Sequence, residues 1–167
     1  MKMKNTTNQQ EIKFLADSML GRLAKWLRIF GYDTTYVACS KDSFLILTAR
    51  KENRILLTRD TRLIQKRNIC DFLFIKSDHW DEQLVEIIKG LKLNIQLNSH
   101  LFSRCSICNT PTLTVDKKNI QPYVPPYVFR SNSDFVYCPF CNKYYWKGTH
   151  WKKMNQKIKK IIEKSSS

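Results

Sequence analysis

The hydrophobic pattern of the first hundred residues switches between two periods, which predicts strands alternating with helices. A short apolar run at residues 14–16 ends at Asp17 and predicts a buried strand. Over residues 20–30, apolar residues recur at helical spacing with basic residues between them. This pattern predicts an amphipathic helix that ends at Gly31.

The same alternation continues to about residue 98. Further strands are predicted over residues 32–37, 54–58 and 71–76, and further helices from 42 or 43 to about 52, over 61–67, and from about 79 to 91. Strands that alternate with helices predict a parallel sheet covered by helices on both faces. We therefore expect an α/β domain over residues 11–98, after a disordered N-terminus at residues 1–10.

The rest of the chain predicts a different kind of domain. Residues 99–151 hold two Cys-x-x-Cys pairs, a proline-rich stretch at 121–126 and several aromatic residues, but no long helical period. Residues 152–164 are spaced for a weakly amphipathic basic helix. We expect a small module held together by metal, followed by a basic tail over residues 152–167.

Composition narrows the class of protein. The chain has 29 Lys and Arg against 14 Asp and Glu, a net charge of +15, and such a field attracts polyanions. Nucleic acid is therefore the first partner to expect, with improved solubility as the alternative meaning of the charge. No apolar run approaches the roughly 20 residues of a membrane span, and the first ten residues lack a secretory signal, so we expect a cytoplasmic protein.

Four of the six cysteines form a pattern typical of zinc binding. The pairs are Cys105 with Cys108 and Cys138 with Cys141, and 29 residues separate them. Two such turns supply the four sulfur ligands of a closed, structural zinc site, and disulfides are not expected in a reducing cytoplasm. An asparagine follows the second cysteine of each pair and tolerates the left-handed backbone that ends such a turn. Cys39 and Cys70 stand alone, and we expect both to be buried small hydrophobes.

Three aspartates are candidates for a second metal site. Asp17 follows the first predicted strand, Asp60 follows the third, and Asp42 begins the helix between them. Parallel sheets bind ligands at the carboxyl ends of their strands, and carboxylate oxygens favour Mg²⁺ or Mn²⁺. Each aspartate also precedes a predicted helix, so the alternative is that all three cap helices.

Basic and aromatic residues near these sites are candidates for substrate binding. In the first domain they are Arg22, Arg59 and Arg62, which could neutralise phosphate or could be solvated charges. In the second domain they are Lys143, Trp146 and His150, where aromatic faces next to cations suit stacking of exposed bases. Some of these aromatics could instead cover the cysteine turns, and His150, which four cysteines leave without a zinc role, could simply pack.

Several motifs together resemble those of the Mut-seven C-terminal ribonuclease family. They are FLADSMLGRLAKWLR at residues 14–28, GYD at 31–33, RILLTRD at 54–60, RCxxCN at 104–109, CxxC at 138–141 and YWxGxH at 145–150. The resemblance implies a PIN-like nuclease domain joined to a zinc ribbon, with Asp17, Asp42 and Asp60 as its acidic residues. PIN nucleases usually hold a further acidic residue, for which Asp78 is the candidate here, with capping of the helix near residue 79 as its alternative.

These observations predict a metal-dependent ribonuclease that hydrolyses RNA phosphodiester bonds. The cofactors would be one structural zinc and catalytic Mg²⁺ or Mn²⁺, and the partner would be RNA. The alternative is a non-catalytic RNA-binding adaptor or a subunit of a ribonucleoprotein, in which the carboxylates act only as helix caps.

Overall fold

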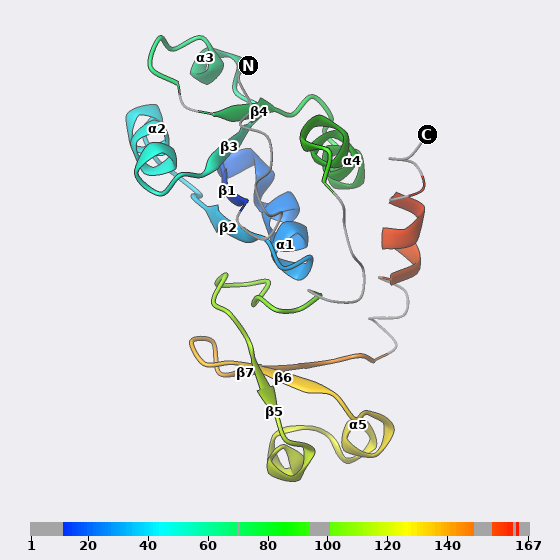
Figure 1. The fold of residues 1–167 in the computed structure, drawn as a ribbon. Helices are drawn as coiled ribbons and strands as arrows, with labels where there is room; N and C mark the ends of the chain where they lie inside the picture. The colour runs from blue at the N-terminus through cyan, green and yellow to red at the C-terminus, as the bar shows by residue number, and fades with distance from the viewer. Residues whose placement is uncertain (1–11, 70, 94–100, 149–154, 162, 164–167) are drawn as a thin grey trace.

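The computed structural model describes residues 12–69, 71–93, 101–148, 155–161 and 163. Its strands are β1 (Lys13–Ala16), β2 (Asp33–Tyr36), β3 (Ile55–Thr58), β4 (Phe72–Phe74), β5 (Leu113–Val115), β6 (Phe135–Cys138) and β7 (Lys143–Trp146). Its helices are η2 (Ser18–Leu20), α1 (Gly21–Ile29), α2 (Asp42–Lys51), α3 (Thr61–Ile64), α4 (Trp80–Leu91), η3 (Lys117–Asn119), η4 (Gln121–Tyr123) and α5 (Pro126–Ser131). The strands form two sheets of different kinds, one above the other in Figure 1.

The first sheet is parallel, with four strands in the order β2-β1-β3-β4. Side chains of successive strand residues point to opposite faces. Phe14 and Ala16 of β1 accordingly join a core with α1 and α4, whereas Leu15 joins a core with α2 and α3. The predicted α/β architecture, a parallel sheet with helices on both faces, is confirmed.

Two predicted elements are shorter in the structure. The helix predicted over residues 61–67 ends at Ile64, and all four residues at 65–68 are exposed. A short helix gains most of its stability from burying an apolar face, and this segment has none to bury. The strand predicted over residues 71–76 is reduced to β4, at the edge of the sheet.

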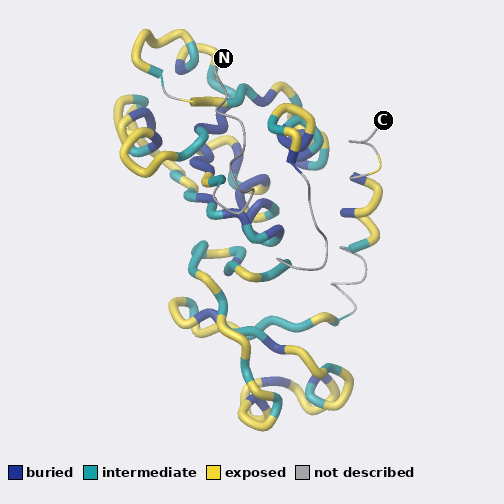
Figure 2. The backbone as a smooth tube through the Cα atoms, viewed as in Figure 1, coloured by how far each residue is buried: buried dark blue, intermediate teal, exposed yellow. Residues whose placement is uncertain are grey.

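The second sheet is antiparallel, in the order β5-β6-β7. Together with η3, η4 and α5 it forms a module, here called the ribbon, whose own core has four buried residues: Ile120, Val124, Val128 and Phe135. Figure 2 shows how much more of the ribbon than of the parallel sheet is exposed. A core this small indicates that the ribbon needs another source of stability.

The basic helix predicted near the C-terminus is observed over residues 155–161. It does not extend the ribbon, but returns to the first domain, where Ile158 and Ile161 are buried in the same core as Leu84 and Ile87 of α4. The ammonium of Lys157 lies 4.4 Å from the ring centroid of Trp80. The first domain is therefore built from both ends of the described chain.

Cys39 departs from its prediction. It is exposed, because it lies just beyond the edge strand β2 in a run of exposed residues at 38–41. Cys70 lies outside the described residues. Among the helices described, none has the length and apolar character that crossing a bilayer would require.

Candidate functional site

The carboxyl ends of β1 and β3 meet where the connections of the parallel sheet reverse direction. From β1 the chain moves outward to β2, then crosses back past β1 to β3. Helix α1 packs on one face of the sheet and α3 on the other. Open parallel sheets bind ligands at such a reversal, and Asp17 and Asp60 both lie there.

Asp17 follows β1 directly and is only 5% exposed. Its Oδ1 accepts a hydrogen bond from the backbone N–H of Met19 (2.9 Å). Its Oδ2 accepts from the hydroxyl of Thr58 and from the backbone N–H of Arg59 (3.2 Å). Asp17 is thus the predicted helix cap, for η2, and it is also a buried carboxylate held in one orientation by three donors.

Asp60 is linked to Asp17 through a single hydroxyl. It caps α3, since its Oδ1 accepts from the N–H groups of Arg62 (2.8 Å) and Leu63 (3.4 Å). Its own N–H donates to Thr58 Oγ1 (3.0 Å), the same fully buried hydroxyl that donates to Asp17. The Thr58 hydroxyl therefore bridges the Asp17 carboxylate and the backbone N–H of Asp60.

Asp42 has a different environment. It is the first residue of α2, whose N-cap is Lys41, and no side-chain cap bond forms there. The prediction that Asp42 caps this helix is therefore wrong. Its carboxylate instead forms an ion pair with Lys66 (2.8 Å), in the segment after α3.

Within the described part of the chain, just one group of three or more metal-ligating side chains is close enough to hold an ion, and it consists of cysteines. The three aspartates do not form a second group of that kind. Thr58 links Asp17 and Asp60, whereas Asp42 is paired with a lysine.

Arg59 places a positively charged guanidinium at the same edge of the parallel sheet. Its guanidinium forms an ion pair with Asp78, an exposed carboxylate beyond β4, while its buried Nε has no hydrogen-bond partner among the described residues. The N-cap of α4 is His79, without a side-chain cap bond. The prediction that Asp78 caps this helix is wrong, because its carboxylate is paired with Arg59.

The other two predicted phosphate contacts lie on separate helices. Arg22, in the first turn of α1, is exposed and its guanidinium lies 5.3 Å from the ring centroid of Trp80. Arg62, in the first turn of α3, is also exposed. Both are accessible to solvent near the helix starts that follow Asp17 and Asp60.

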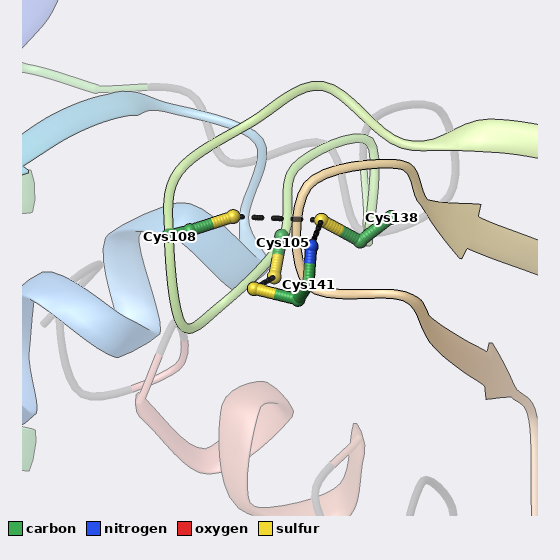
Figure 3. A group of neighbouring side chains, drawn as sticks. All are labelled: Cys105, Cys108, Cys138 and Cys141. Carbon is green, nitrogen blue, oxygen red and sulfur yellow. Dashed lines mark hydrogen bonds between the residues drawn. The ribbon is translucent and has the colours of Figure 1, made fainter.

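The cysteine cluster forms where the turn at residues 105–108 meets the connection between β6 and β7 (Figure 3). Its four Sγ atoms, from Cys105, Cys108, Cys138 and Cys141, all lie within 4.8 Å of one another. Two of the separations are 3.8 Å, between Cys105 and Cys141, and 3.4 Å, between Cys108 and Cys138. Four sulfurs about 2.3 Å from a central zinc would be about 3.8 Å apart, so this donor set could hold a zinc ion.

The backbone of both cysteine turns has the predicted geometry. Asn109 and Asn142 have positive φ angles of 72° and 53°. In the first turn, burial opposes ionisation of Cys108, but hydrogen bonds with Thr110 lower its pKa to about 6. In the second turn, the pKa values of Cys138 and Cys141 are raised, that of Cys138 chiefly by burial and that of Cys141 chiefly by hydrogen bonds with the other cysteines.

Asn109 also joins the ribbon to the parallel sheet, a role that the sequence did not reveal. Its Oδ1 accepts from the buried N–H of Thr34 (3.0 Å), and its Nδ2 donates to Asp33 (2.8 Å). Asp33 in turn accepts from Arg54 (2.6 Å). Burial alone would raise the pKa of Asp33, but hydrogen bonds from Arg54 and Asn109 outweigh it, so this pKa lies below its ordinary value.

Arg28 is a second link between the domains. It is buried, and its guanidinium donates to the carbonyls of Thr34 (2.8 Å), Ile107 (2.7 Å) and Ser106 (3.2 Å). The last two carbonyls belong to the turn between Cys105 and Cys108. One sequence signal could have pointed to this role, because Arg28 falls one helical turn after Ala24, on the apolar side of α1.

We predict that Asn109→Gly lowers the free energy of unfolding by about 2 to 4 kcal/mol, because it leaves the buried Thr34 N–H unpaired and removes a hydrogen bond to a charged group. Glycine keeps the positive φ without strain. Asn142→Gly is the matched control, since it loses one exposed bond, from the Tyr137 hydroxyl, and should cost less than about 1 kcal/mol. Urea unfolding with zinc present measures both, and equal losses would contradict a special role for Asn109.

The predicted contacts on the ribbon differ in exposure. Lys143 is exposed, whereas Trp146 and Tyr144 are partly buried and pack against the ribbon core. Tyr144 stacks on the exposed Tyr123 with ring centroids 5.2 Å apart. His150 lies outside the described residues.

The chain thus combines a parallel sheet that has Asp17 and Asp60 at its reversal point with an antiparallel ribbon whose four clustered cysteines could hold a metal ion. Residues 12–158 match the family described as Mut7-C RNAse domain. The chain belongs to this family, as its motifs predicted, and the family indicates a ribonuclease-like function. The comparisons of this chain with curated proteins and with solved structures found no match.

Proposed function

We propose that this protein is a metal-dependent ribonuclease that hydrolyses RNA phosphodiester bonds at the carboxyl edge of its parallel sheet. One observation carries the proposal: in a member of a ribonuclease family, Asp17 and Asp60 lie together at the reversal point of the sheet, where the Thr58 hydroxyl donates to the Asp17 carboxylate and accepts from the Asp60 backbone N–H. The cytoplasm is the expected compartment, where thiols stay reduced and free for zinc.

The two carboxylates fit a Mg²⁺ or Mn²⁺ ion. Mg²⁺ is commonly held by one or two carboxylates, with waters and substrate phosphate completing its shell. Asp17 offers a preoriented carboxylate, and Asp60 uses Oδ1 for its cap, which leaves Oδ2 for a ligand. When bound, such an ion would supply an activated water and would stabilise charge on the scissile phosphate.

Asp42 would be the weakest of the three ligands. Its ion pair with Lys66 at 2.8 Å must open before its carboxylate can serve the site. Arg59 and Arg62 flank Asp60 and would neutralise phosphate oxygens, as would Arg22. The ribbon would hold zinc through its four cysteines and contact RNA through Lys143, Trp146 and His150.

We predict that a labelled single-stranded RNA is cleaved with Mg²⁺ or Mn²⁺ and stays intact when neither is added, because the carboxylates alone cannot generate a nucleophile from water at neutral pH. The divalent ion should be omitted rather than chelated, because a chelator would also remove zinc. Electrophoresis of the RNA over time measures cleavage. Binding of the RNA without cleavage under any of these conditions would favour the adaptor alternative.

A further inference from the structure

A groove of about 710 Å³ runs along one side of α1. Its floor includes Arg22, Lys25, Trp26 and Ile29, which recur at i, i+3, i+4 and i+7 and so form one face of the helix. The opposite, apolar face of α1 is buried in the core. We call this feature the α1 groove.

The α1 groove extends from the start of α1 to the turn between Cys105 and Cys108. At one end, the ring of Tyr36 lies directly against Gly21. A Cβ atom added to Gly21 would be only 3.0 Å from this ring. The Tyr36 hydroxyl donates to the carbonyl of Ser18 (3.1 Å), the residue after Asp17. At the other end, the wall is formed by Ser106 and Ile107, which lie between the first two cysteines.

The lining of the α1 groove suits a strand that carries both phosphates and bases. Arg22 and Lys25 are exposed cations, and the described lining contains no acidic residue. Arg22 lies over the Trp80 ring, 5.3 Å from its centroid, a cation–π contact that leaves N–H donors for a phosphate. The side chains of Tyr36 and Ile107 expose apolar surface, with 36% and 49% of these residues accessible.

Arg28 also lines the groove but plays another part. Three backbone carbonyls already accept from its guanidinium, so it fixes the ribbon against α1. The wall at Ile107 is therefore held in place relative to the cations on the helix. A groove with fixed walls loses little conformational entropy when a ligand binds.

We propose that the α1 groove binds a segment of single-stranded RNA and leads it to the edge that holds Asp17 and Asp60. Arg22 and Lys25 would contact successive phosphates, and a base would lie against Tyr36. Stacking on aromatic side chains requires unpaired bases, which makes a single strand the expected ligand. This proposal rests on the proposed ribonuclease function and names the path of its substrate.

The salt dependence of binding tests the phosphate contacts. For single strands, each phosphate contact contributes about 0.7 to the slope of log K against log salt concentration. The double variant Arg22→Gln/Lys25→Gln should therefore lower this slope by about 1.4 and weaken binding roughly tenfold or more. Lys51→Gln/Lys89→Gln removes the same charge from the exposed ends of α2 and α4, and should change the slope much less.

Binding is measured by fluorescence anisotropy of a labelled oligouridine RNA without added Mg²⁺ or Mn²⁺, so that no cleavage interferes. A second pair of variants tests stacking: Tyr36→Leu should weaken binding about fivefold or more, whereas Tyr36→Phe, which keeps the ring, should bind nearly as wild type. Unchanged zinc content and unfolding midpoints establish that each variant is folded.

The outcomes separate this proposal from the ribonuclease function. If the groove variants show a smaller salt dependence of binding but the wild type never cleaves RNA, the groove binds RNA and the nuclease proposal fails. If the wild type cleaves RNA while the groove and control variants have equal slopes, the groove proposal is overturned. Tighter binding of duplex than of single-stranded RNA would overturn it as well.

Discussion

Replacing Asp60 with asparagine is expected to slow metal-dependent RNA cleavage roughly 1,000-fold and to leave the fold intact. The amide Oδ1 of asparagine can still accept from the N–H groups of Arg62 and Leu63, so the cap of α3 survives. What is lost is the negative charge that holds the cation. Metal stabilisation of a phosphoryl transition state is worth several kcal/mol, and each 1.36 kcal/mol corresponds to a factor of ten in rate.

Asp116→Asn is the matched control for this prediction. Asp116 caps η3 in the ribbon through one backbone bond, from Lys118 (3.0 Å), and takes no part in the proposed site. Cleavage by this variant should equal that of the wild type, measured as single-turnover rates with saturating Mn²⁺. Wild-type rates in the Asp60 variant would leave capping as the sole role of that aspartate.

Asp17→Asn would be a less clean test than Asp60→Asn. All three groups that face the Asp17 carboxylate donate hydrogen bonds to it. The NH₂ group of asparagine would have to face at least one of these donors in a buried site, which costs about 1 to 3 kcal/mol. A loss of activity in that variant would therefore combine a lost ligand with a weakened fold.

Removal of zinc is expected to unfold the ribbon. Its own core consists of four buried residues, and structural zinc contributes about 10 to 16 kcal/mol in comparable small modules. We predict one zinc per chain, and its loss in the variant Cys138→Ser, whose sulfur is fully buried at the end of β6. The antiparallel sheet should melt while the parallel sheet keeps most of its structure.

Elemental analysis after purification in reducing, chelator-free buffer measures the zinc content, and circular dichroism measures the loss of ordered structure. Cys39→Ser is the control, because Cys39 is exposed and does not belong to the cluster. It should retain one zinc per chain. A wild-type protein without zinc, or a Cys138 variant with unchanged zinc, would contradict the prediction.

Much of the fold could be predicted because its signals are local. Each strand and helix of the first domain carries its own hydrophobic period, and the alternation of the two limits the sheet to a parallel one. Asp17 and Asp60 could be placed at the edge of the sheet because each directly follows a strand. The left-handed residues that follow the cysteine pairs could also be predicted locally, because asparagine tolerates a positive φ angle.

What could not be predicted depends on contacts between distant parts of the chain. The bond between Asn109 and Asp33 joins residues 76 apart, and no local pattern distinguishes this asparagine from Asn142. The pairing of Asp42 with Lys66 likewise follows from how α2 and the segment after α3 pack on the same face of the sheet. The sequence could name Asp42 as a carboxylate near the edge, but not its partner.

The return of the helix over residues 155–161 to the first domain affects how the protein is made. Its Ile158 and Ile161 complete a core begun by residues such as Phe14, so this core stays unfinished on the ribosome until the ribbon has been synthesised. The ribbon is synthesised before the helix over residues 155–161. Its cysteines can therefore bind metal while the apolar side chains around Leu84 are still exposed to solvent. Exposed apolar surface of this kind is where nascent chains aggregate or recruit chaperones. The first domain to be synthesised is therefore the last whose core can be completed.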